Sequence, residues 1–243
     1  MRVVSLLLCV ICLTACAEVE SKDDPIIVPD LSSIDSPFDA FVRLPKQLHD
    51  GLKMRKSHVD HVAIEDIYAT QFESEELVEL LVRWQPYIIN LIEASHRIEP
   101  PLPAEPKYTD AELSEGAYLN GITARLFNNS RLLVTDALRC WSIGDYDGCG
   151  ARFDAVLRMA ICSYRSEETM HQHNGTLLLQ TVIIELELRV NDGLGDKLAP
   201  DRVREILATI RDLQEARLQA GIRSNTGDRI LGHLIEVFSQ EGE

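Results

Sequence analysis

The sequence predicts an all-α domain of antiparallel helical hairpins, packed as a bundle or a short α-solenoid, behind a disordered N-terminal tether. From Pro37 onward, apolar residues recur at intervals of three and four, which is the spacing of an amphipathic helix. No stretch of strict alternation is longer than Ile184–Val190, for which a strand is the alternative. Hydrophobic residues make up 45% of the 243 residues, which is enough for a buried core.

Residues 1–15 are predicted to be a signal peptide. Arg2 precedes an unbroken run of apolar or small residues from Val3 to Ala15. As a helix, this run of about thirteen residues would span roughly 20 Å, which is less than the roughly 30 Å hydrocarbon core of a bilayer. We therefore do not expect a permanent membrane-spanning segment here, and no other stretch of the sequence is long and apolar enough to span a membrane.

The run ends in Leu13-Thr14-Ala15-Cys16, which resembles the lipobox of bacterial lipoproteins. The resemblance implies that Cys16 is acylated, that the chain is cleaved before it, and that the lipid holds an exported protein on the bacterial membrane. In that family an aspartate after the cysteine favours the inner membrane, so Ala17 favours the outer membrane, with the domain in the periplasm or at the cell surface. A cleaved signal peptide that merely contains a cysteine is the alternative.

Residues 16–36 form the lipidated cysteine and a flexible acidic tether, and residues 37–243 form the helical domain. The tether is rich in Asp, Glu and Pro, a composition that cannot bury enough apolar surface to fold. In the domain, a proline-rich stretch at 99–108 is a candidate subdomain boundary. Two short helices are expected in 38–70. The next helix is expected to begin at about 74 with a break at Pro86, and another is expected from the capping box at 109–112 to Gly144. Further helices are expected from about Cys149 and at about 176–190, 200–220 and 227–240.

The two helices that flank Gly144-Asp145-Tyr146 form a predicted antiparallel hairpin. This corner resembles that of tetratricopeptide-type repeats, and the resemblance covers about forty residues without the 34-residue recurrence of that family. A generic helical hairpin also needs glycine at its corner and is the alternative. The segment Leu177–Ile184 is apolar almost all round, so we expect it to be buried at the centre of the bundle.

Three cysteines remain in the mature chain after removal of the signal peptide and lipidation of Cys16, namely Cys140, Cys149 and Cys162. Cys140 and Cys149 lie at similar distances on either side of the predicted corner, where antiparallel helices face each other. Because an exported domain meets an oxidising compartment, Cys140–Cys149 is the candidate disulfide. Three buried, reduced thiols are the alternative.

Two Glu-x-x-His units, Glu93–His96 and Glu168–His171, are candidate metal ligands. This spacing places a carboxylate and an imidazole on one helix face, as in di-metal centres within helical bundles. Chance also generates such spacing in a chain with many glutamates, and Glu93 lies close to the break at Pro86. The pairs His58/His61 and His171/His173 are explained by solvated faces or loops. Apart from this metal ion, no cofactor is expected.

The composition and motifs argue against several classes of function without identifying one. A net charge of −15 argues against a nucleic-acid partner, because binding to phosphates depends on lysine and arginine. No Gly-x-Ser-x-Gly, P-loop or His-Glu-x-x-His motif is present. We expect a non-enzymatic, lipid-anchored scaffold or interaction module that binds another envelope protein. The alternatives are a periplasmic metal-binding protein or enzyme that uses the Glu-x-x-His units, and a small-ligand carrier.

Three polar residues, Asn129, Asp136 and Arg152, fall near the apolar faces of the predicted hairpin. A cavity lined by these side chains and a buried polar network between helices are both compatible with this pattern.

Overall fold

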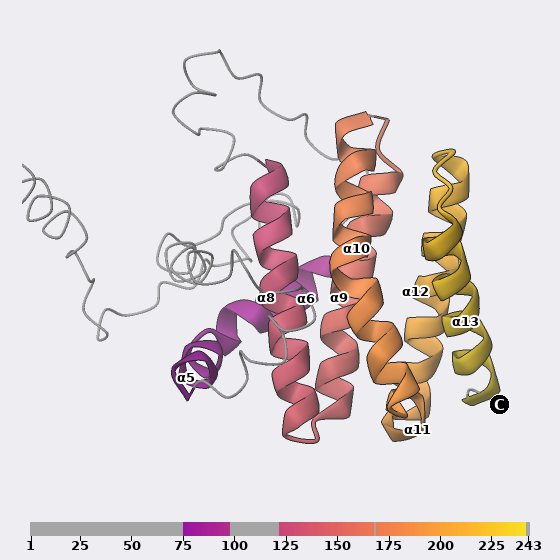
Figure 1. The fold of residues 1–243 in the computed structure, drawn as a ribbon. Helices are drawn as coiled ribbons and strands as arrows, with labels where there is room; N and C mark the ends of the chain where they lie inside the picture. The colour runs from indigo at the N-terminus through magenta and orange to yellow at the C-terminus, as the bar shows by residue number, and fades with distance from the viewer. Residues whose placement is uncertain (1–74, 98–121, 168, 242–243) are drawn as a thin grey trace, which may run out of the picture.

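The computed structural model describes residues 75–97, 122–167 and 169–241, and every regular element within these ranges is an α-helix (Figure 1). The predicted all-α class is therefore confirmed, and Ile184–Val190 is helix and not strand. The helices are α5 (Glu75–Arg83), α6 (Gln85–Ser95), α8 (Ile122–Ser142), α9 (Tyr146–Tyr164), α10 (Thr169–Asn191), α11 (Leu194–Lys197), α12 (Pro200–Gln219) and α13 (Asn225–Glu241). The predicted signal peptide, tether, first two helices and boundary at 99–108 lie outside the described residues.

A proline separates α5 from α6, as the sequence predicts. Trp84 is the residue between the two helices, and Pro86 occupies the first turn of α6. Proline has no backbone N–H to donate, so it is tolerated in a first turn but interrupts a continuous helix. The break redirects the chain so that α6 can pack against α9.

Gly144 forms the corner between α8 and α9. Its φ of +77° lies in the left-handed region that favours glycine, and Asp145 N–H donates to the carbonyl oxygen of Cys140 at 2.9 Å. The Asp145 side chain then caps α9 by accepting a hydrogen bond from Gly148 N at 3.0 Å. This cap starts α9 at Tyr146, slightly before the start near Cys149 that the sequence predicts.

The helices form two layers. In Figure 1, α8, α10 and α13 stand in front, with α6, α9 and α12 behind them. Helix α9 packs against α6, α8, α10 and α12, and α10 packs against α8 and α13 as well as α9. Helices that are neighbours in the same layer therefore contact one another as well as the helices of the opposite layer. Both predicted architectures, a helical bundle and a short α-solenoid, have packing of this kind.

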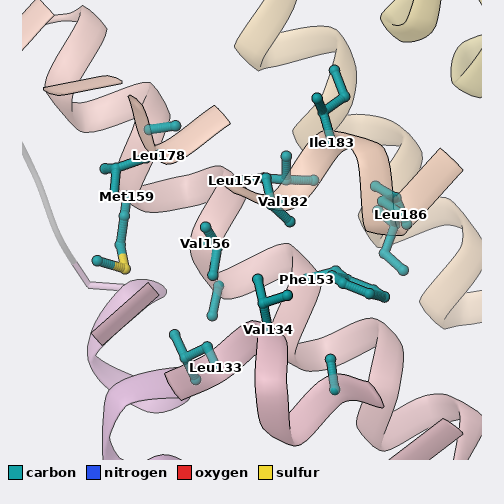
Figure 2. Close-up of a cluster of buried hydrophobic side chains, with 14 of the residues drawn as sticks. Leu133, Val134, Phe153, Val156, Leu157, Met159, Leu178, Val182, Ile183 and Leu186 are labelled. Carbon is teal, nitrogen blue, oxygen red and sulfur yellow. The ribbon is translucent and has the colours of Figure 1, made fainter. Parts of the chain in front are cut away.

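The core lies between these layers, and α9 is its centre. Figure 2 shows side chains from α8, α9 and α10 interdigitating, among them Leu133, Phe153 and Val182, which are all fully buried. Burying a side chain of this size contributes about 1.5–3 kcal/mol. Helix α9 is buried along most of its length, which follows from its contacts with helices in both layers.

In residues 75–97, 122–167 and 169–241, none of the helices combines the length and the apolar character that crossing a membrane requires.

Candidate functional site

Helix α10 exposes an apolar stripe on the face that is turned away from the core. Ile184 and Leu188 are 46% and 42% exposed, and Leu177 and Thr181 on the same face are half-buried. The four positions are separated by four, three and four residues, so they follow one line along the helix. We define Leu177, Thr181, Ile184 and Leu188 as the α10 stripe. The expectation that this segment is buried all round is therefore wrong for its outer face.

The packing of α10 explains why this face stays open. The opposite face buries Leu178, Val182 and Leu186 against α9 (Figure 2), while α8 and α13 contact α10 from its own layer. No described helix covers the outer side. An apolar stripe that continues over several turns of one helix is more informative than isolated exposed side chains, because such surfaces often bind a partner.

A buried carboxylate lies beside the stripe. Glu185 is almost fully buried on α10, and this burial raises its pKa above the ordinary value for glutamate, while the nearby Arg189 acts in the opposite direction. The outer surface of α10 therefore offers apolar contacts at the stripe, beside the exposed Gln180 and the half-buried Glu187, whereas Glu185 is withdrawn from solvent.

Asp136 is the centre of a buried polar network that joins three helices. Gln85 Nε2, on α6, donates to the two carboxylate oxygens of Asp136 at 2.9 and 3.0 Å. Arg139 Nε, on α8, donates to Oδ1 at 2.5 Å, and Arg152 Nε, on α9, donates to Oδ2. Arg152 also donates through Nη2 to Gln85 Oε1 at 2.9 Å and through Nη1 to the carbonyl oxygen of Gly148 at 2.8 Å.

Asn129 belongs to a second buried contact, in which Tyr87 OH donates to its Oδ1 at 3.0 Å. Burial raises the pKa of the Tyr87 hydroxyl, so Tyr87 remains a donor across the physiological range. Of the two interpretations of Asn129, Asp136 and Arg152, the buried polar network between helices is confirmed. These residues fix how α6, α8 and α9 meet.

The two Glu-x-x-His units lie at different places in the fold. Glu93 and His96 are both exposed near the end of α6. His171 is buried in the first turn of α10, whereas Glu168 lies outside the described residues. Within the described chain, His96 gathers with Asp154 and Glu205, and neither Glu93 nor His171 belongs to that group. A metal site formed by both Glu-x-x-His units stays a prediction, as does any role for His58 and His61, which also lie outside the described residues.

Asp154 and Glu205 are the residues near His96 that spacing in the sequence did not reveal. Asp154 is on α9 and Glu205 is on α12, so more than fifty residues separate each from the next along the chain. The available signal was an aspartate between the apolar residues Phe153 and Val156, since a charge on a buried face calls for a partner.

Cys140, Cys149 and Cys162 are buried in this structure, and no disulfide joins Cys140 to Cys149. Burial raises the pKa of the Cys140 and Cys149 thiols to about 12, so thiolate, the reactive form, is rare at neutral pH. The arrangement corresponds to the reduced alternative, and the Cys140–Cys149 disulfide stays a prediction.

Comparison with known proteins finds no match to this chain among protein-family models, curated protein sequences or solved structures.

Proposed function

We propose that this protein is a non-enzymatic scaffold of the bacterial envelope, anchored by a lipid on Cys16, that binds another envelope protein through the α10 stripe. The observation that carries the proposal is the exposure of Ile184 and Leu188 in the middle of a layer of packed helices. Burying an exposed leucine or isoleucine contributes about 1.5–3 kcal/mol at most, so these side chains offer a binding partner a substantial gain.

The spacing of the stripe indicates the kind of partner. Positions 177, 181, 184 and 188 follow the seven-residue period with which one helix contacts another lengthwise. An amphipathic helical segment of the partner would place its own apolar stripe along this line. The net charge of −15 favours a segment with lysine or arginine at its borders, since opposite charge raises the association rate.

The experiment is site-specific photo-crosslinking in cells with the full chain. A photoreactive amino acid replaces Ile184 or Leu188, and the crosslinked products are identified by mass spectrometry. The matched control carries the same amino acid at Leu218, which is 55% exposed on α12 in the other layer. We expect the same crosslinked protein from positions 184 and 188, and not from position 218.

A charge-introducing variant then tests whether the contact contributes to binding. The double variant Ile184→Lys, Leu188→Lys should weaken binding of the crosslinked partner by at least about tenfold, because central apolar contacts each contribute about 1–2 kcal/mol or more. Leu218→Lys should leave the affinity unchanged. If position 218 gives the same crosslinks, or if the double variant binds the partner normally, the stripe is not the binding surface.

A further inference from the structure

Three side chains from three helices come together where the end of α6 meets α9 and α12. His96 follows the last residue of α6, Asp154 lies in the middle of α9, and Glu205 lies in the second turn of α12. Each offers one ligand atom, and these atoms lie within 4.8 Å of one another. The distance from His96 Nδ1 to Glu205 Oε1 is 3.7 Å.

Asp154 supplies an independent sign that this cluster is incomplete. Its side chain is fully buried, and Oδ2 accepts a hydrogen bond from Arg158 Nε at 2.6 Å. Oδ1 is also buried and has no hydrogen-bond partner within the described residues. A buried acceptor that is left unsatisfied costs about 1–3 kcal/mol, and more when it is charged. A cation near this carboxylate would remove that cost.

We propose that His96, Asp154 and Glu205 bind a divalent transition-metal ion, with Zn²⁺ as the best match. Imidazole nitrogen and carboxylate oxygen are common zinc ligands, whereas Mg²⁺ and Ca²⁺ prefer ligand sets made of oxygen alone. This proposal does not depend on the scaffold function. It shares His96 with the two Glu-x-x-His units, whereas Asp154 and Glu205 belong to neither unit.

The distances are close to those that zinc requires. With bonds of about 2.0–2.1 Å and tetrahedral angles, two zinc ligands lie about 3.3 Å apart. His96 Nδ1 and Glu205 Oε1 are 3.7 Å apart, so a shift of a few tenths of an ångström would bring these two atoms to the separation that zinc requires. The exposure of His96 leaves room for water in the remaining coordination position, as in zinc sites with three protein ligands.

Two arginines compete with the ion for the same oxygens. Arg158 Nε donates to Asp154 Oδ2, and Arg158 Nη2 lies 3.4 Å from Glu205 Oε1. Arg202 Nη1 lies 2.5 Å from Glu205 Oε2. Both guanidinium groups are partly exposed, so they can turn toward water when the ion binds. The two carboxylates match the charge of a divalent ion. The free energy needed to displace Arg158 determines how tightly the site binds that ion. Removal of Arg158 should therefore strengthen zinc binding, which a purely structural ion-pair cluster would not show.

The experiment is calorimetric titration of the tag-free full chain in detergent with Zn²⁺, Mn²⁺ and Ca²⁺, together with metal analysis of the protein. We expect one Zn²⁺ per chain and no saturable Ca²⁺ binding. His96→Ala and Glu205→Gln should each weaken Zn²⁺ binding by at least about tenfold, since each removes one of three protein ligands. Arg158→Gln should tighten it, with a larger rise in Tm on adding Zn²⁺ than in the parent protein.

Matched controls separate this site from the alternatives. Glu93→Gln changes an exposed carboxylate three residues before His96, and His173→Ala removes an exposed histidine from α10. Both variants should bind Zn²⁺ like the parent protein. Because His96 and Glu205 lie at least partly at the surface, circular dichroism should show that their variants fold. The proposal is overturned if Zn²⁺ binding survives both substitutions, if Arg158→Gln does not tighten it, or if Glu168→Gln abolishes it while Glu205→Gln does not.

Discussion

At the scale of single residues, Asp136 determines how three helices meet. Its carboxylate accepts hydrogen bonds from Gln85, Arg139 and Arg152, which belong to α6, α8 and α9. All of the charged groups in this network are buried, and the Asp136 carboxylate is the counter-charge for both guanidinium groups. In a low-dielectric interior, the loss of such a partner leaves charge that water cannot reach.

Asp136→Asn should lower the free energy of unfolding by about 3–5 kcal/mol, because it leaves Arg139 and Arg152 buried without a counter-charge. Urea denaturation followed by circular dichroism measures this change. The matched control is Asp201→Asn, whose carboxylate is exposed on α12 and paired with Arg204, so that its loss should cost less than about 1 kcal/mol. Similar costs for the two variants would show that the Asp136 network contributes no more than a surface ion pair.

At the scale of elements, replacement of glycine by alanine is expected to have opposite effects on stability at two positions, because the backbone conformations there differ. Gly144 has a φ of +77° at the corner between α8 and α9, and beyond its chain neighbours no atom of the described residues lies within 4 Å of an added Cβ. Gly232 lies in the interior of α13, also with open space around it. The two positions therefore isolate the effect of backbone conformation from that of packing.

Gly144→Ala should destabilise the protein by about 1–2 kcal/mol, because alanine is strained in the left-handed region. Gly232→Ala should stabilise it by roughly 0.5–1 kcal/mol, because glycine lowers the stability of a helix interior. Thermal unfolding of both variants measures the two effects. Equal shifts in Tm of the same sign would contradict the assigned backbone conformations.

The elements that could be predicted are those with a local chemical signal. Pro86 marks the break between α5 and α6, and Gly144 with Asp145 marks the next corner. Helix α10 instead begins at Thr169, about seven residues before its predicted start at 176. Its first turns carry polar residues and Gly175, which look like a loop in the sequence. A Cβ at Gly175 would lie 3.1 Å from the Tyr164 ring, so this glycine serves close helix packing.

The candidate sites were less predictable because they depend on which helices meet. The segment Leu177–Ile184 of α10 is apolar almost all round, and its sequence does not show that Ile184 and Leu188 lie on the side that the neighbouring helices leave open. His96 was identified as a candidate metal ligand, but Asp154 and Glu205 reach it only through the packing of α9 and α12. Local spacing along one helix could not reveal a cluster that three helices supply.

At the scale of the whole molecule, Cys16 is predicted to connect the domain to the membrane. Growth of a bacterial host with an alkyne-tagged fatty acid should label the full chain, and Cys16→Ser should remove the label because the acylated thiol is lost. In-gel fluorescence of membrane fractions measures the labelling. Cys12→Ser, within the predicted signal peptide, is the matched control and should be labelled normally. Label that persists in Cys16→Ser would contradict the lipobox assignment.

The position of α10 between α8 and α13, with α9 behind it, has a consequence for the energetics of binding. Neighbours on three sides hold the α10 stripe in one conformation before any partner arrives, so little conformational entropy is lost on this side of the interface. The entropy lost on binding then comes mainly from the partner. A segment that is helical before it binds should therefore bind more tightly than a flexible chain with the same apolar residues.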